Sequence, residues 1–168
     1  IEMEGTYPLP EAQLDRFLLK VLIPFPDEAD LVRVFERTTS SIKTAVSAIL
    51  PGSEILDHRA LAREVILADS LSAHAAALIM ATHPANKPAP DAVRRFVRFG
   101  ASPRGGQAII LGAKVRALMD GRYNVSFEDI RETLLPALRH RIILGFEGEA
   151  EGQTTDDVLR AVLDHIKP

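Results

Sequence analysis

Ser102, Pro103 and Arg104 place a cation at the point where a helix is expected to begin. Ser102 is a typical N-cap and Pro103 a typical first helical residue, so Arg104 falls in the first turn. The free backbone N–H groups and the helix dipole already gather positive charge there, which disfavours a cation by about 0.3–1 kcal/mol. An anion is therefore expected at this position.

Two glycines, Gly105 and Gly106, follow the arginine and leave room for a ligand close to the backbone. The Ser102 cap, the helix dipole and the Arg104 guanidinium then converge on one oxyanion, an arrangement that suits the γ-phosphate of a nucleotide. The alternative is that Arg104 pairs with a carboxylate of a neighbouring helix or is solvated. The spacing of the residues does not decide between the two.

The composition describes a globular chain without a strong charge. It has 168 residues, of which 46% are hydrophobic and 26% charged, which is enough for one core with or without a second small unit. Twenty Lys and Arg residues against 23 Asp and Glu residues give a net charge of −3, which does not favour nucleic acid or an anionic membrane. We interpret the basic run Arg94, Arg95, Arg98 and Arg104 as a solvated face or a protein-partner surface, and expect no nucleic-acid partner.

The same composition excludes several kinds of site. There is no cysteine, and the five histidines show no close ligand spacing, so no metal site is expected. No apolar run is long enough to span a bilayer, and the N-terminus lacks the pattern of a signal peptide. We therefore expect a cytoplasmic protein.

The elements that must position these residues follow from the apolar periodicity and the Pro, Gly and capping residues. A short helix is expected over residues 11–16, and a buried strand over 17–25. A helix over 27–37 and a polar connection over 38–53 follow. The rest is expected to be helical, with helices over 53–63, 69–83, 103–120, 126–141 and from 154 onward.

Two of these helices carry further information. The helix after Ser102 is expected to bury a face rich in small residues, which implies close helix packing. That face consists of Ala108, Leu111, Gly112, Val115, Leu118 and Met119. Arg139, His140 and Arg141 fall near the end of the next helix, where cations suit the dipole, and this placement requires no function.

Four segments of the chain resemble the C-terminal part of MoxR-type AAA+ ATPases, and they occur in the order that the family shows. They are EGTYPLPEAQLDRF, VRFGASPRGGQ, ALMDGRYNVSFEDI and LPALRHRIIL. The resemblance covers most of the chain and is weakest over residues 38–60. It implies a mainly α fold, an AAA+ lid helical bundle preceded by a short strand and helix from the end of the α/β AAA+ core.

The resemblance also implies a division of the chain into three parts. Residues 1–26 would be the tail of the AAA+ core, with the arginine-finger helix and the last strand. Residues 27–55 would form a linker helix and an extended connection, and residues 56–168 the helical lid domain with sensor 2.

Particular residues acquire roles by the same resemblance. Arg16, in the LDRF segment, would be the arginine finger that reaches the γ-phosphate held by the adjacent subunit. Arg104 would be sensor 2, with Ser102 and Gly105 beside it at the nucleotide. A guanidinium stabilises the charge that phosphoryl transfer spreads over the γ-oxygens, so an arginine supplied by a neighbour makes hydrolysis depend on assembly.

Without the resemblance, Arg16 is more simply read as an exposed arginine that pairs with a nearby carboxylate. The candidates are Asp15, Glu11 and Glu36. The partners implied by the family are ATP with Mg²⁺, neighbouring subunits of a ring with chaperone-like remodelling activity, and a protein with a von Willebrand factor A domain.

The sequence contains no Gly-x-x-x-x-Gly-Lys-Ser/Thr loop and no acidic pair suited to magnesium. We therefore expect a piece of a longer ATPase that does not hydrolyse or hold ATP by itself. The competing interpretation is a non-enzymatic helical interaction module in which Arg104 is structural.

Overall fold

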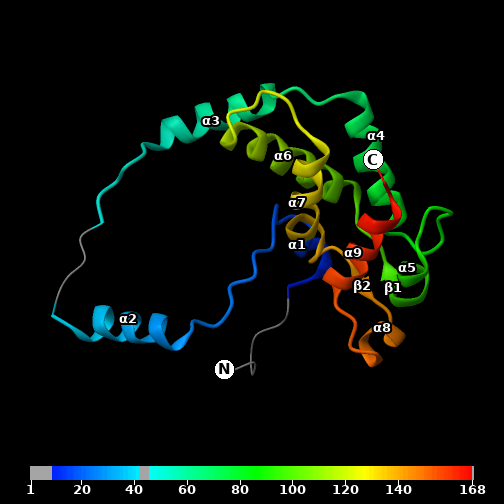
Figure 1. Cartoon of the computed structure of the whole chain (residues 1–168), viewed down its shortest axis with the longest axis horizontal. Coiled ribbons are helices and arrows are strands. Elements are labelled where there is room, and N and C mark those ends of the chain that lie inside the picture. Colours follow the sequence, from blue (N-terminus) through cyan, green and yellow to red (C-terminus); the bar gives the residue numbers. More distant parts are fainter. Residues whose placement is uncertain (1–8, 42–45, 168) are drawn as a thin grey trace.

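The structure is a computed structural model that describes residues 9–41 and 46–167. Residues 1–8, which open the predicted core tail, lie outside this range. The chain runs through α1 (Glu11–Leu14), α2 (Glu28–Thr39), α3 (Gly52–Glu64), α4 (Asp69–Ala81), α5 (Asp91–Phe96), β1 (Val97–Phe99), α6 (Pro103–Met119), α7 (Phe127–Leu138), β2 (Ile143–Leu144), α8 (Phe146–Ala150) and α9 (Thr155–His165). The predicted mainly α fold class is confirmed (Figure 1).

Helix α6 lies at the centre of the bundle. It packs most extensively on α7 and also contacts α3 and α4, while α5, α8 and α9 pack together beside them (Figure 1). The sheet is small: β1 and β2 pair antiparallel, with Val97 opposite Leu144. The largest fully buried hydrophobic side chains are Leu78, Val93, Ile109, Ile130, Leu134, Leu138, Val158, Leu159 and Val162.

The ends of the helices follow local side-chain signals. Ser126 and Asp129 form a reciprocal capping box at the start of α7, and Thr154 and Asp157 form another at α9. Ser102 caps α6 with Pro103 at its first position. These starts were predicted correctly because a cap and its amide lie within three residues of each other.

The predicted inner face of α6 was partly wrong. Met119 is 82% exposed and Val115 45%, while Gly105 and Ala113 are buried. The helix is turned by its close contact with α7, where a Cβ on Gly112 would lie 2.4 Å from Cγ2 of Thr133. Val115 and Met119 instead line an apolar hollow of about 950 Å³ between α3, α6 and α7.

The predicted buried strand at residues 17–25 was also wrong in its burial and pairing. The segment has no strand partner within the described residues, and Val21, Ile23 and Phe25 are 72%, 88% and 84% exposed. A strand needs a second strand to pair its backbone groups, and within the described residues no strand lies beside this segment. The apolar run therefore remains exposed and forms no regular element.

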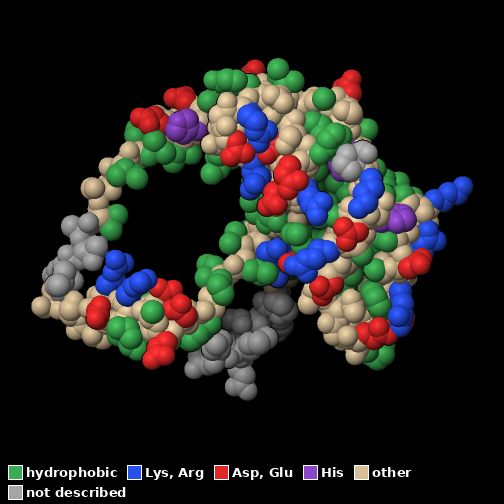
Figure 2. Space-filling model, viewed as in Figure 1, with side chains coloured by type: hydrophobic (Ala, Val, Ile, Leu, Met, Phe, Trp, Pro, Cys, Tyr) green, Lys and Arg blue, Asp and Glu red, His purple; other side chains and the backbone are tan. Residues whose placement is uncertain are grey.

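Helix α2 forms where it was predicted but stands apart from the bundle (Figures 1 and 2). Asp27 caps it by accepting a hydrogen bond from the Asp30 amide at 2.8 Å. Its apolar side chains are not buried, and Phe35 is 57% exposed. The capping and amphipathic pattern is therefore sufficient for the helix but does not decide what it packs against.

Candidate functional site

The N-terminus of α6 presents Ser102 and Arg104 as the sequence predicts. The Ser102 hydroxyl oxygen accepts a hydrogen bond from the Arg104 amide at 3.2 Å, and the Arg104 side chain is 57% exposed. The cation therefore lies on the first turn of the helix and faces solvent on one side.

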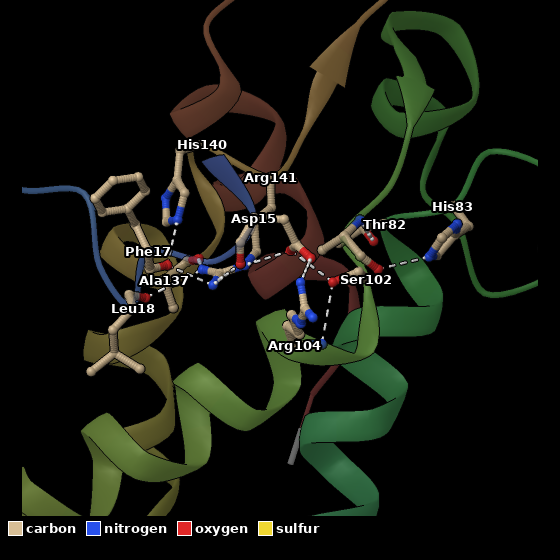
Figure 3. Close-up of polar contacts among 11 residues, drawn as sticks. Asp15, Phe17, Leu18, Thr82, His83, Ser102, Arg104, Ala137, His140 and Arg141 are labelled. Carbon is tan, nitrogen blue, oxygen red and sulfur yellow. Dashed lines mark hydrogen bonds and ion pairs between the residues drawn. The ribbon is translucent and has the colours of Figure 1, made fainter. Parts of the chain in front are cut away.

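The residues that follow α4 form hydrogen bonds with the loop that precedes Ser102 (Figure 3). The Thr82 hydroxyl accepts a hydrogen bond from the Ala101 amide at 3.0 Å, and His83 Nε2 donates to the Ala101 carbonyl at the same distance. A Cβ on Gly100 would lie 2.6 Å from the Thr82 carbonyl oxygen, so only glycine fits there without a shift. Local sequence patterns do not reveal this support, because it joins the residues that follow α4 to the residues that precede α6.

An anion does lie beside Arg104, and it is the carboxylate of Asp15 at the end of α1 (Figure 3). The Ser102 hydroxyl donates a hydrogen bond to Asp15 Oδ1 at 2.7 Å. Arg104 Nη1 lies 3.6 Å from Asp15 Oδ2, an ion pair longer than a hydrogen bond. Pairing with a carboxylate of a neighbouring helix, the alternative raised for Arg104, is thus observed in this chain.

Arg141 is the residue that the sequence analysis missed. Its side chain is only 3% exposed, and its Nε donates to Asp15 Oδ1 at 3.0 Å. Its two terminal nitrogens donate to the main-chain carbonyls of Asp15, Phe17 and Leu18, at 2.9, 2.7 and 3.2 Å. Nη1 also donates to the Ala137 carbonyl at the end of α7.

The two preceding residues, Arg139 and His140, contact the same segment. Arg139 binds both carboxylate oxygens of Asp156 at 3.0 Å and donates to the Lys20 carbonyl at 3.2 Å. His140 Nε2 donates to the Phe17 carbonyl at 3.0 Å, so its neutral form carries the proton on Nε2. Burial lowers the pKa of His140, and the charges of Arg141 and Lys20 lower it further.

Arg16 directly follows Asp15 and is exposed. Within the described residues its guanidinium forms no ion pair, so none of the three suggested pairings, with Asp15, Glu11 or Glu36, is present. The fold therefore leaves this side chain available to a group outside the described residues.

Gly105 is buried and faces α7. A Cβ there would lie 2.6 Å from Leu138 Cδ2 and 3.3 Å from Arg141 Cδ. The absence of a side chain thus brings the first turn of α6 against α7. A hollow of about 660 Å³ adjoins this region; it is lined by Asp15, Ser102, Arg139, His140 and Arg141, among others.

Other predicted features have local structural partners. Arg94 donates to the Ala89 and Lys87 carbonyls, at 3.0 and 2.9 Å, and Arg95 pairs with Glu147 and Glu151. Arg98 lies over the ring of Phe99.

Over residues 9–41 and 46–167 no cluster of three His, Asp or Glu side chains is arranged to hold a metal ion. No helix in the same ranges has the length and apolar character needed to cross a bilayer.

Comparison with known proteins agrees with the resemblance found in the sequence. Residues 90–162 match the AAA lid domain family. Chaperone MoxR1 of Mycobacterium tuberculosis is 32% identical over 166 residues, which cover 99% of this chain and 44% of that protein. Protein MoxR of Methylorubrum extorquens is 30% identical over 181 residues, covering 99% and 52%.

A solved structure is also similar. The crystal structure of a candidate ATPase from Cytophaga hutchinsonii matches with a TM-score of 0.90 and 33% identity, over 99% of this chain and 51% of that chain. The chain spans about half the length of the curated relatives it matches. These findings confirm the similarity to the MoxR-type AAA+ proteins and the presence of a lid domain.

Proposed function

We propose that this chain, which corresponds in sequence and fold to the lid-containing half of MoxR-type AAA+ proteins, supplies two arginines to ATP hydrolysis in a ring-shaped, chaperone-like remodelling complex. Arg104 acts as sensor 2, and Arg16 acts as the arginine finger for the neighbouring subunit. The observation that carries the proposal is that both arginines are exposed and close to Asp15 in the structure or in the chain. Arg104 forms an ion pair with the Asp15 carboxylate, and Arg16 is the residue that follows Asp15.

The surroundings of Arg104 fit a phosphate oxygen. The Ser102 hydroxyl and the Arg104 guanidinium already converge on an anionic group, the Asp15 carboxylate, at the positive end of a helix dipole. Gly105 contributes by letting that first turn sit against α7. The ion pair of Arg104 with Asp15 is long and the Arg104 side chain is 57% exposed, so little free energy is lost when Arg104 binds a phosphate oxygen in place of this carboxylate.

Arg16 has the properties that a finger in trans requires. It is exposed, and it has no ion-pair partner within the described residues. Its backbone is anchored because the neighbouring carbonyls of Asp15 and Phe17 accept hydrogen bonds from Arg141. The anchored backbone fixes the point from which the Arg16 side chain extends, and its guanidinium can then stabilise charge on the γ-oxygens of an adjacent site.

ATP with Mg²⁺ would supply the transferable γ-phosphoryl group and the neutralisation of its charge. Ser102 and Arg104 fit one edge of that group, and Gly105 supports them by allowing the first turn of α6 to pack against α7. The phosphate-cradling loop and the magnesium ligands would belong to the part of the relatives that this chain does not match. The 168-residue chain alone is therefore expected to bind a fluorescent ATP analogue weakly and to release no phosphate.

The remaining partners rest on the similarity to the family. We infer that the ring is built from neighbouring copies of one subunit in the cytoplasm. A protein with a von Willebrand factor A domain is inferred as the remodelling partner. We expect no nucleic-acid partner, because a net charge of −3 does not favour binding to a polyanion.

The test uses a protein of the relatives' full length whose lid-containing half is this chain. Arg16→Ala is expected to lower kcat by about 10³-fold or more, because an arginine finger contributes 10³–10⁵. Arg104→Ala is expected to lower it by about 10²-fold, the effect of removing one preorganised donor. Arg37→Ala removes another exposed arginine, on α2, and serves as the control. Normal ATP turnover in both variants would overturn the proposal.

Mixed rings separate a finger in trans from one in cis. Arg16→Ala subunits are mixed with subunits that lack the phosphate-binding lysine outside this chain. If Arg16 acts on the adjacent subunit, the mixture regains part of the activity that each variant lacks. A mixture as inactive as its components would show that Arg16 serves its own subunit or none.

A second function has one observation in its favour. The ion pair between Arg104 and Asp15 is what a non-enzymatic helical interaction module with a structural Arg104 would show. That function predicts a lower unfolding free energy for Arg104→Ala. The exposed 3.6 Å pair instead leads us to expect a change below about 1 kcal/mol.

A further inference from the structure

The segment formed by residues 15–20 lies between two helix ends of opposite polarity (Figure 3). The C-terminus of α7 presents carbonyl oxygens that find partners outside the helix, and the Pro136 carbonyl accepts a hydrogen bond from the Lys20 amide at 2.8 Å. The N-terminus of α6 carries the opposite partial charge, and the Asp15 carboxylate accepts the Ser102 hydrogen bond there. The segment thus joins the two central helices of the bundle.

One carboxylate connects the contacts of this segment. Asp15 Oδ1 accepts hydrogen bonds from both Ser102 Oγ and Arg141 Nε, and Asp15 Oδ2 faces Arg104. The Asp15 side chain is 22% exposed, which places it between the buried Arg141 and the exposed Arg104. Any displacement of Asp15 therefore alters the contacts of Arg104, and it also moves Arg16, the next residue in the chain.

Arg141 holds the segment through its main chain. It donates hydrogen bonds to three main-chain carbonyls of residues 15–18, so these contacts do not depend on the side chains of Phe17 and Leu18. Its planar guanidinium serves these carbonyls and Asp15 at once, whereas a lysine ammonium is a single point charge with another geometry. Arg141 is also fixed to its own helix by the Ala137 carbonyl.

We propose that Arg141 is a positioning residue: it anchors the Arg16 segment to the lid and, through Asp15, keeps Arg16 and Arg104 in a fixed relation. The two arginines then move as one unit. A change in the lid at Arg104 is transmitted to Arg16, and so to the site of the adjacent subunit. The functional meaning of this link rests on the proposed function, but the link itself does not.

The test measures the link directly on the 168-residue chain. Because the sequence has no cysteine, Gln13→Cys and Arg116→Cys provide two exposed labelling sites. Gln13 lies on α1, and Arg116 is 12 residues beyond Arg104 on α6, about 18 Å along the helix axis. Pulsed electron paramagnetic resonance between nitroxide labels then reports how α1 sits on α6.

We expect a single narrow distance distribution in the chain with native Arg141. Arg141→Lys and Asp15→Ala should each lose that narrow distribution. Asp157→Asn removes a carboxylate from another Arg–Asp pair, with Arg160 on α9, and should retain it. If Arg141→Lys does not fold, Arg141→Met combined with Asp15→Asn leaves no buried unpaired charge and is expected to fold without the link.

A purely structural role gives a different result. In that case the Arg141 variants lower Tm but keep the narrow distribution at temperatures well below Tm, and the proposal is overturned. The kinetic test of Arg16→Ala and Arg104→Ala is independent. If the label distances change in the Arg141 and Asp15 variants but ATP turnover is normal in Arg16→Ala and Arg104→Ala, the link is retained and the proposed function is overturned. If the distances do not change but ATP turnover falls, only the link is overturned.

Discussion

Nε of Arg141 lies 3.0 Å from Oδ1 of Asp15, which joins the turn after α7 to the end of α1. The two residues are 126 positions apart in the sequence. The guanidinium is almost completely buried and also serves main-chain carbonyls, so the pair is part of the packed interior rather than a surface contact.

This burial predicts that replacing Arg141 lowers the free energy of unfolding more than replacing the exposed Arg160. Arg141→Met should lower the free energy of unfolding by about 3 kcal/mol or more, because it breaks a buried, hydrogen-bonded ion pair. Arg160→Met removes an arginine that is 59% exposed and pairs with Asp157, and should cost less than about 1 kcal/mol. Urea denaturation of both variants measures the difference. Equal losses would mean that Arg141 contributes no more than a surface pair.

The contact between α6 and α7 predicts a second asymmetry, between two glycines of one helix. Gly112→Ala should destabilise the chain by about 1–3 kcal/mol, because its Cβ would lie 2.4 Å from buried Thr133. Gly106→Ala has only an ordinary 3.4 Å contact with Ile79 and should gain up to about 1 kcal/mol from its higher helix propensity. Thermal unfolding followed by circular dichroism measures both. A stable Gly112→Ala would show that the two helices separate easily.

His140 predicts a loss of stability in mild acid. Burial lowers its pKa, so near its ordinary value of about 6.5 the unfolded chain binds more protons than the folded chain. The contribution of His140 to stability is therefore complete above this pH and is lost as the pH falls through the folded pKa. The Nδ1 atom, which would take the proton, is buried without a hydrogen-bond partner in the described structure.

The measurement is the free energy of unfolding as a function of pH for wild type and His140→Gln. The variant should lose less stability between about pH 7 and 5. The pKa of His74 is also lowered by burial, so this residue still makes the free energy of unfolding of the variant depend on pH. His165→Gln, which replaces an exposed histidine at the end of α9, controls for the loss of a histidine. Identical pH profiles for wild type and His140→Gln would contradict the prediction.

The contacts of Asp129 predict a further loss of folding stability at lower pH. It binds Arg122 through both oxygens, at 2.7 and 2.8 Å, and accepts a hydrogen bond from the Ser126 amide at 2.8 Å. The Arg122 guanidinium, together with Ser126, lowers the pKa of this carboxyl to about 2. The Asp129 carboxylate therefore contributes about 2 kcal/mol to the free energy of unfolding above pH 4, and this contribution is lost as the pH falls toward 2.

Asp129→Asn should remove this part of the acid denaturation and lower stability at neutral pH. Asp164→Asn replaces an exposed carboxylate that has no ion-pair partner among the described residues, and should leave the acid profile unchanged. Acid titration followed by circular dichroism compares the two. An Asp129→Asn chain with the wild-type acid midpoint would mean that the carboxylate is not held by Arg122.

The sequence by itself determined the features that depend on close neighbours in the chain. The caps at Ser102, Ser126 and Thr154 were predicted because each side chain bonds an amide two or three residues away. The position of Arg104 on the first turn follows from the same signals. The similarity to the MoxR-type proteins was also readable, because it lies in unbroken segments of sequence.

Tertiary structure alone decided what those elements contact. The face that α6 buries is decided by the fit of Gly112 against Thr133, and residues 17–25 remain exposed because no strand lies beside them. Arg141 reads in the sequence as one of three cations near a helix end. Its carboxylate is 126 residues away, and no local pattern encodes a pair that forms only when α1 is folded against the ends of α6 and α7.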